Sequence, residues 1–365
     1  MIKYTVRRLL QAIPVMFGIT LVCFMLMHLQ PGNPADRFAQ NARVTTAQID
    51  AFKHRWGLDD PLWLQYLKWT GVWGDKGVVN ALPGGSVDIA GLHVDLPGGD
   101  NGMLHGDLGY SITDGRLVVD VIADRFPPTV VLAGTAFLIW ITLAFLAGVY
   151  AAVKRYGLFD SFLTIFNYIG YSLPTFWVGL VLITLFTAEP FRWFPASGMW
   201  DARSVPVFGS SEYWAFVGSD PLYALTDLAR HLALPVATLV MVSIAGDSRF
   251  IRSSMLDSLN QDYVKTARAK GVSERRVVFR HALRNAMLPV ITNLGLEIPI
   301  IFAGAVATET VFSWPGMGRQ FVEAVNHADY PVLMGVLLIS SVIVVLANLL
   351  ADIMYAVVDP RVKYD

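Results

Sequence analysis

Residues 129–153 read TVVLAGTAFLIWITLAFLAGVYAAV and carry no charged side chain. The hydrocarbon core of a bilayer is about 30 Å thick, and a helix needs roughly 20 mostly apolar residues to cross it. The stretch meets that length, so we expect a membrane-spanning helix over 129–153. Within it, Ala144, Gly148 and Ala152 recur at four-residue spacing. Small residues at this spacing let a second helix backbone come close.

The composition of the whole chain is typical of a membrane protein. Of its 365 residues, 54% are apolar and only 16% are charged, whereas soluble domains average about 25% charged residues. The formal net charge of -1 argues against nucleic acid as a partner, because neutralising phosphates needs an excess of Lys and Arg. The single cysteine, Cys23, excludes an intrachain disulfide and a cysteine-based metal cluster.

Five further segments meet or approach the length of a membrane span. They are Leu9–Leu29, Ser161–Thr187, Leu232–Ser248, Ala286–Ala307 and Val332–Val358. The chain is therefore predicted to be an all-α membrane protein with six transmembrane helices.

Charge asymmetry orients these helices. If the N-terminus is inside, the inner segments 1–8, 154–160, 249–285 and 359–365 hold most of the Lys and Arg residues. This is the positive-inside pattern, which predicts that both termini are cytoplasmic. A cleaved signal peptide is the alternative for the start, but its apolar region would be shorter and an A-x-A-like site would follow.

The predicted orientation divides the chain into three parts. Residues 1–29 form the cytoplasmic N-terminus and first span, and 30–128 form an extracytoplasmic domain that is too polar and too rich in Gly and Pro to span. Residues 129–365 hold the other five spans. Gly-Pro clusters at 83–85 and 97–99 bound possible short strands. A second outer loop, 188–231, is rich in aromatic residues and suits an interfacial belt or a docking surface.

Polar residues inside the spans are candidates for a translocation pathway. Glu297 lies midway along the fifth span, and intramembrane acids are functional hypotheses by default. Structural pairing, for example with Asn293 one turn earlier, is an equal alternative. Asn293 and Asn167 are also typical of hydrogen bonds between helices.

Other span residues have less specific expectations. Pro174, Pro289 and Pro299 remove backbone donors and predict kinks. Asp247 lies near a predicted cytoplasmic end, where solvent or Arg partners are available, and Glu309 lies near an outer end, where we expect it to be solvated.

The longest cytoplasmic connection, 249–285, is strongly basic. Small residues at Thr266, Ala267, Ala269 and Gly271 predict a short helix that allows close backbone approach, with Gly271 as its stop. Ser273 fits the cap of the next helix.

That next helix has arginines at four-residue spacing, Arg276, Arg280 and Arg284. The stripe would point at anionic headgroups or at a partner. The positive-inside bias alone also accounts for it.

Residues 263–289, YVKTARAKGVSERRVVFRHALRNAMLP, closely resemble the EAA loop of ABC importer permeases, in the dipeptide, oligopeptide and nickel branch. Further matches cover most of the chain: RRLLQAIPVMFGIT at 7–20, QPGNPAD at 30–36, HGDLGYSI at 105–112, ETVFSWPGMG at 309–318, ADYP at 328–331 and ADIMYAVVDPR at 351–361. Two departures occur within the loop. The Glu-Ala-Ala positions read Lys265-Thr266-Ala267, and the expected Leu-Pro reads Leu283-Arg284, as is usual for the peptide branch.

The resemblance implies the type I ABC importer permease fold, with six membrane helices per subunit, in a bacterial or archaeal cell inner or plasma membrane. It also implies a homologous second permease, two cytoplasmic ATPase subunits that bind ATP and Mg, an extracytoplasmic solute-binding protein and a di- or oligopeptide substrate. The residues that it assigns to ATPase coupling are Tyr263, Thr266, Ala267, Arg268, Ala269, Lys270 and Gly271. Residues 70–103 and 200–228 are longer than in typical members and would suit contacts with a binding protein.

No enzyme site emerges from the motifs. The chain has no G-x-x-x-x-G-K-[ST] sequence to cradle ATP, no G-x-S-x-G elbow and no histidine spacing suited to a metal. The chain is therefore predicted to be a non-catalytic permease subunit that holds no cofactor of its own.

Two alternatives within transport stay open. Nickel or another small solute could replace peptide as cargo, because the permease motifs report on coupling more than on cargo. An ion-driven secondary transporter would show inverted repeats and discontinuous helices in matching halves, and no such symmetry is visible. A membrane scaffold is disfavoured by the kinked, polar-bearing spans.

Overall fold

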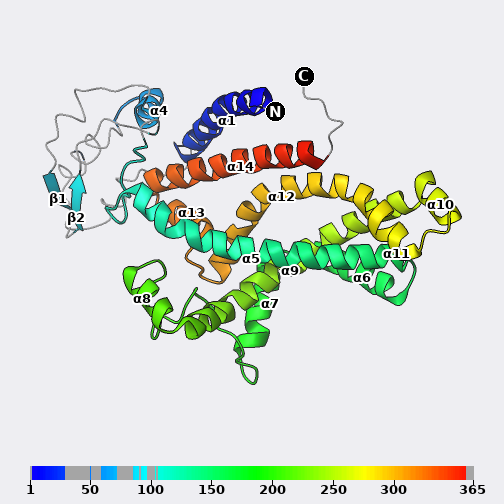
Figure 1. Ribbon diagram of the computed structural model, residues 1–365. Coiled ribbons are helices and arrows are strands. Elements are labelled where there is room, and N and C mark those ends of the chain that lie inside the picture. Colours follow the sequence, from blue (N-terminus) through cyan, green and yellow to red (C-terminus); the bar gives the residue numbers. More distant parts are fainter. Residues whose placement is uncertain are drawn as a thin grey trace. The chain divides into compact units, whose positions relative to one another are not determined.

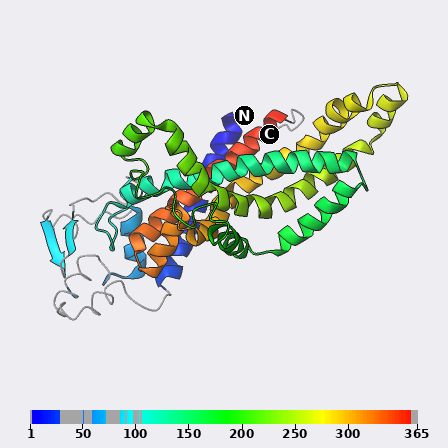
Figure 2. The ribbon, with the colours of Figure 1, turned by 90° about the horizontal axis from the view of Figure 1, so that it is seen from below.

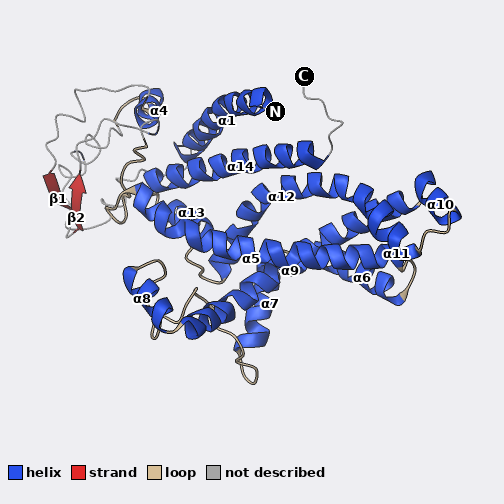
Figure 3. Cartoon of the chain, in the orientation of Figure 1, coloured by secondary structure: helices blue, strands red, loops and turns tan. Residues whose placement is uncertain are grey.

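The computed structural model describes residues 2–28, 59–71, 85–89, 92–96 and 106–358, with the single positions Asp50 and Met103. Nearly all of this part is helical, as Figure 3 shows. The helices are α1 (Ile2–His28), α4 (Leu62–Thr70), α5 (Val118–Val153), α6 (Leu158–Ser172), α7 (Thr175–Thr187), α8 (Ser211–Ser219), α9 (Pro221–Leu259), α10 (Asp262–Ala269), α11 (Glu274–Arg276), the π-helical segment η2 (Val277–Ala282), α12 (Leu283–Val311), α13 (Met317–Asn326) and α14 (Tyr330–Val358).

Two short strands form a hairpin in the segment between α4 and α5. Strands β1 (Gly85–Ile89) and β2 (Leu92–Leu96) pair in antiparallel register, with Gly85 opposite Leu96 and Ile89 opposite Leu92. The short strands expected between the two Gly-Pro clusters are confirmed.

The chain divides into two compact units. The first holds Met1–Thr5, Pro127–Arg319 and Ile343–Asp365, and the second holds Val6–Phe126 and Gln320–Val342. Helices α5 and α14 each contribute to both units.

Several helices have the length and composition of membrane spans. In the part of the chain that the structure describes, Val118–Val153, Pro221–Leu259 and Tyr330–Leu350 each meet both criteria. Helices α6 and α7 meet them as a bent pair, and α1 offers the shorter apolar stretch Ile13–Met25. These helices confirm a multi-span α-helical membrane protein.

The first unit is packed around α9. Helices α6, α7 and α12 all contact it, and the arrangement can be followed in Figures 1 and 2. At Gly148 of α5, an added Cβ would lie 2.7 Å from the Ser248 backbone oxygen and 2.9 Å from the Ile251 Cβ. At Gly170 of α6, it would lie 3.1 Å from the Met241 backbone oxygen. The close approach expected at Gly148 is confirmed, and Gly170 provides a second one.

The third predicted span is broken rather than merely kinked. Helices α6 and α7 make an angle of 105° across the break at Leu173 and Pro174. Pro174 lies at the N-cap of α7, where its missing N–H leaves no hydrogen bond unmade. Helix α12 continues through Pro289 and Pro299, and kinks at these positions stay predictions.

Two predicted spans were too short. Helix α5 begins at Val118 rather than Thr129, and α9 runs from Pro221 to Leu259 rather than over 232–248. In both cases polar turns extend an apolar segment, because helical hydrogen bonds continue beyond the point where hydropathy falls. The Asp220 side chain caps the early start of α9 by accepting a hydrogen bond from the Tyr223 N–H at 3.0 Å.

The expectation of a solvated Glu309 was wrong, because this carboxylate is fully buried in the first unit. It accepts hydrogen bonds from the Thr129 hydroxyl at 2.7 Å and from the Arg319 backbone N–H at 3.0 Å. A Cβ at Gly316 would collide with it, so glycine leaves the space that it fills. Glu309 therefore ties the turn between α12 and α13 to α5.

A buried aspartate plays a similar part in the second unit. The Asp329 carboxylate, ahead of α14, accepts a hydrogen bond from the Ser111 hydroxyl at 2.6 Å. The backbone N–H groups of Ile112 and Thr113 also donate to it, at 3.2 and 3.1 Å. Gly335 lies close enough to Val118 that a Cβ there would meet the valine side chain. The start of α14 is thus joined to the segment before α5.

The contact at Gly148 predicts a stability difference between two glycines of α5. Gly148→Ala should lower the free energy of unfolding by about 1–3 kcal/mol, because the methyl group forces α9 away. Gly134→Ala is the matched control, since a Cβ there meets nothing within 4 Å, and it should be neutral or stabilising by up to about 1 kcal/mol. Thermal unfolding in detergent measures both, and equal melting temperatures would contradict the close packing.

Candidate functional site

Helix α10 is the short helix expected in the basic connection, and a glycine ends it. Gly271 has φ +74°, a left-handed conformation that glycine adopts without strain. The Gly271 N–H donates to the Arg268 carbonyl at 2.9 Å, and the Val272 N–H donates to the Ala267 carbonyl at 3.2 Å. This pair of bonds is a Schellman motif. The predicted helix stop at Gly271 is confirmed.

One face of α10 is fixed to its own chain. Val264 is fully buried and Ala267 nearly so, and both belong to the hydrophobic core that includes Met255 and Val277. A polar chain strengthens this attachment. The Tyr263 hydroxyl lies 2.7 Å from the Ser258 hydroxyl, which itself donates to the Ala282 carbonyl at 2.7 Å. Helix α10 is thereby joined to both α9 and η2, as Figure 1 shows.

The opposite face of α10 is exposed and mixes small with charged residues. Thr266 and Ala269 are exposed on it, and the Arg268 guanidinium forms two hydrogen bonds with the Glu274 carboxylate, at 2.6 and 3.1 Å. This guanidinium lowers the pKa of Glu274, mainly through the hydrogen bond. The Lys265 ammonium likewise lowers the pKa of the exposed Asp262 carboxyl, 2.9 Å away. Both pairs are at the surface, so they order the loop more than they stabilise the fold.

The structure separates the seven residues predicted for coupling into two groups. Tyr263, Thr266, Arg268, Ala269, Lys270 and Gly271 are exposed, whereas Ala267 is buried. Ala267 was grouped with the other small residues because the sequence alone does not say which face of a short helix meets its own core. It supports α10 from beneath and is not on the surface that a partner would meet.

The helix after α10 differs from the regular basic helix predicted there. Ser273 occupies the N-cap of α11, but its side chain makes no capping hydrogen bond. Val277–Ala282 is a π-helix, so the arginine spacing does not follow a regular α-helical face. Arg276, Arg280 and Arg284 are nevertheless all exposed.

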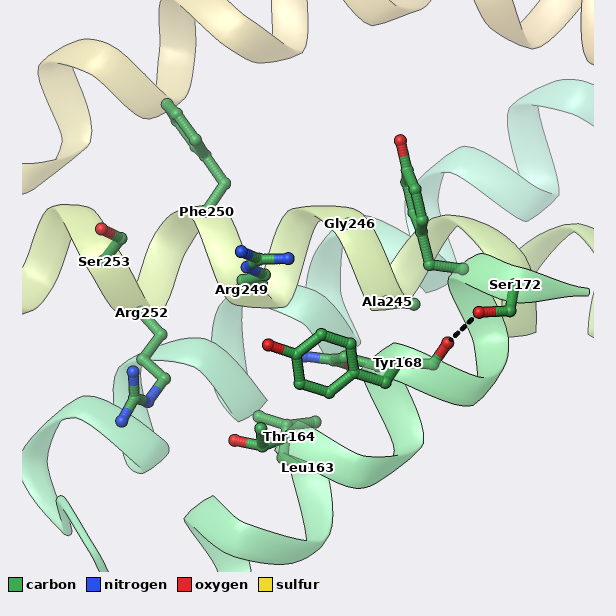
Figure 4. A pocket seen from close by; sticks show the side chains of 12 residues that line it. Leu163, Thr164, Tyr168, Ser172, Ala245, Gly246, Arg249, Phe250, Arg252 and Ser253 are labelled. Atoms are coloured by element: carbon green, nitrogen blue, oxygen red, sulfur yellow. Dashed lines mark hydrogen bonds between the residues drawn. The ribbon is translucent and has the colours of Figure 1, made fainter.

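A groove of about 700 Å³ lies between α6 and α9 in the first unit. Figure 4 shows Arg249 of α9 above the ring of Tyr168 of α6, with 5.7 Å from the guanidinium carbon to the ring centroid. Asn167 also lines the groove, and its amide exchanges hydrogen bonds with the Ser248 hydroxyl at 3.0 and 3.2 Å. The expectation that Asn167 bonds between helices is confirmed.

The other two pathway candidates lie elsewhere on α12. The Asn293 amide donates to the Asp247 carboxylate at 3.4 Å, and the Trp140 indole N–H donates to the same carboxylate at 2.5 Å. Asp247 is buried, so the expectation that solvent or arginine would pair with it was wrong. The Glu297 side chain lies outside the described residues.

The sequence gave no reason to single out Arg249, Tyr168 or Gly246, which share the groove. Arg249 directly follows the apolar part of α9, so the positive-inside bias appeared to account for it. The available signal was the four-residue spacing from Ala245 to Arg249, which places Arg249 on the face of α9 that meets α6. In the described part of the chain, no group of three or more His, Cys, Asp or Glu residues could hold a metal ion.

Comparison with protein families identifies two matching segments. Residues 144–364 match the model described as "Binding-protein-dependent transport system inner membrane component". Residues 1–81 match the N-terminal model of the same kind of membrane component. Together they include α10, the groove and the start of the chain.

Curated relatives match the chain over its whole length. The oligopeptide transport system permease protein AppB of Bacillus subtilis is 37% identical over 365 residues, covering 100% of each chain. The di/tripeptide transport system permease protein DppB of Pseudomonas aeruginosa is 38% identical, covering 100% of this chain and 99% of the relative. The dipeptide transport system permease protein DppB of Escherichia coli K12 is 35% identical with the same coverage. The chain therefore belongs to the family of binding-protein-dependent transport system inner membrane components, the membrane-spanning permease subunits of ABC importers.

Proposed function

We propose that this chain forms half of the translocation pathway for di- or oligopeptides in an ABC importer, and that α10 receives the motion of a partner ATPase. The observation that carries the proposal is the two-faced construction of α10. Its exposed face presents Thr266 and Ala269, which let a partner come close. Its other face is fixed to α9 and η2. A force on the exposed face would therefore reach the long helices.

The complex would contain a homologous second permease, two cytoplasmic ATPase subunits holding ATP and Mg, and an extracytoplasmic solute-binding protein. Closure of the ATPases on ATP would push α10, and α9 and α12 would then move with it. The permease would alternate between inward-facing and outward-facing states, with nucleotide biasing the equilibrium. The names of the relatives support peptide as the cargo.

The same proposal places the chain in the cell inner membrane with six spans and both termini in the cytoplasm. Residues 30–128 would form the extracytoplasmic domain, with 129–365 as the permease core and 249–285 as the coupling loop. The insertions at 70–103 and 200–228 would contact the solute-binding protein. Asn167, Asn293 and Glu297 are the proposed pathway residues, and the first lines the α6–α9 groove.

Peptide uptake tests the function as a whole. The permease reconstituted with its partners in proteoliposomes should accumulate labelled peptide only when ATP and Mg are supplied to the ATPase side. The partner complex with a Walker-motif lysine substituted in the ATPase is the control and should not transport. Uptake that ignores ATP and follows a proton gradient would instead identify an ion-driven transporter.

Coupling is tested by two matched Ala→Trp variants. Ala269→Trp places a bulky side chain on the exposed face of α10, so it should lower ATP-driven uptake at least tenfold without unfolding the permease. Ala215→Trp is the control, because Ala215 is exposed on α8, another short helix. Uptake and ATPase activity are measured together with detergent melting temperature. Normal uptake in Ala269→Trp would contradict the coupling role.

Glu297→Gln tests the pathway role of the fifth predicted span. The variant keeps the size and hydrogen bonding of the side chain but removes its charge, so uptake should fall while assembly with the ATPases stays intact. Co-purification measures assembly, and the initial rate measures uptake. An unchanged rate would assign Glu297 to structural pairing.

A further inference from the structure

Two arginines one turn apart on α9 have different environments. Arg252 is paired, since its guanidinium donates to both carboxylate oxygens of the buried Asp160, at 2.5 and 2.8 Å. Arg249 forms no ion pair with a carboxylate within the ranges that the structure describes, and its guanidinium lies over the Tyr168 ring. Arg252 therefore holds α9 to the start of α6, whereas Arg249 keeps its donors available.

The groove beside Arg249 is built like a small-molecule site. Its volume of about 700 Å³ falls within the roughly 300–1,000 Å³ usual for ligand pockets. Gly246 borders it, and a Cβ at this position would meet nothing within 4 Å, so the wall is open there. Figure 4 shows the Ser172 hydroxyl directed at the Tyr168 carbonyl, at 2.8 Å. This bond stays within α6 and leaves the Arg249 guanidinium unobstructed.

The chemistry of the groove favours a carboxylate. A guanidinium presents paired donors that match the two oxygens of a carboxylate. The Tyr168 ring below the guanidinium restricts its orientation, which lowers the entropy lost when an anion binds. Tyr171, also on the groove, offers an exposed aromatic face to the rest of a ligand. One charged group and several aromatic and hydroxyl groups suit a short peptide.

We propose that Arg249 binds the C-terminal carboxylate of a peptide as it passes through the α6–α9 groove. This inference rests on the proposed function as a peptide importer and assigns one of its contacts to a named residue. An anionic lipid headgroup is the competing ligand. The polar residues Thr164, Asn167 and Ser253 along the groove favour a peptide, because an acyl chain would need an apolar wall.

The test compares a peptide with a free C-terminal carboxylate and the same sequence ending in an amide. Uptake into proteoliposomes is measured for wild type, Arg249→Gln and Arg155→Gln. Arg155 is the matched control, because its guanidinium also lies over a tyrosine ring, that of Tyr156 at 4.5 Å, but outside the groove. Each rate is divided by the amount of peptide-loaded binding protein. Vesicles of neutral lipid and vesicles with anionic lipid are compared throughout.

We expect Arg249→Gln to lower uptake of the free acid about tenfold, as the loss of one charge-assisted hydrogen bond implies. Its uptake of the amide should equal that of wild type, and Arg155→Gln should behave as wild type with both peptides. An equal fall for both peptides, or no fall, overturns the inference. An effect seen only in anionic vesicles assigns Arg249 to lipid and also overturns it. ATP-independent uptake by wild type would instead overturn the proposed function.

A second measurement covers the case in which the binding protein does not accept the amide. The photoreactive residue p-benzoylphenylalanine replaces Tyr171, and irradiation during turnover should attach labelled free-acid peptide to the permease. Adding Arg249→Gln should reduce this adduct about tenfold, whereas adding Arg155→Gln should not. An adduct of equal yield in both backgrounds, or no adduct at all, counts against the peptide site.

Discussion

The first unit depends on how closely other helices approach α9. A membrane offers no water to drive helices together, so close packing of small residues must do so. Gly148 of α5 meets the Ser248 carbonyl, and Gly170 of α6 meets the Met241 carbonyl. These two contacts bring polar groups of α9 within reach of their partners, including the pairing of Ser248 with Asn167. The groove and the attachment of α10 both build on this arrangement.

Close packing also explains why the two buried acids of the first unit are tolerated. Asp247 receives hydrogen bonds from Trp140 and Asn293, which lie on α5 and α12. Glu309 receives them from Thr129 and from the backbone of Arg319. A buried polar group is costly unless it is hydrogen-bonded. Each acid therefore joins elements that are far apart in sequence, and it makes their arrangement specific.

The sequence predicted those features that depend on local chemistry. Apolar length located the spans, Pro174 located the break between α6 and α7, and Gly271 located the end of α10. It did not predict which groups meet across helices, so Asp247 and Glu309 were expected to meet solvent. Within the candidate site, small size alone placed Ala267 with the exposed residues, although it packs inward. Arg249 was overlooked because one span viewed alone does not reveal the ring of Tyr168 opposite.

The π-helical segment Val277–Ala282 has a consequence for how this loop can change in evolution. A π-turn contains one residue more than an α-turn, and one residue corresponds to a rotation of about 100° around the helix axis. Losing a single residue from 277–282 would restore a regular helix, but it would turn everything on one side of the deletion relative to the other. Helix α10 packs against this segment, so its outward face would acquire a new azimuth relative to α12. Substitution can tune this joint, whereas a one-residue deletion would change its phase.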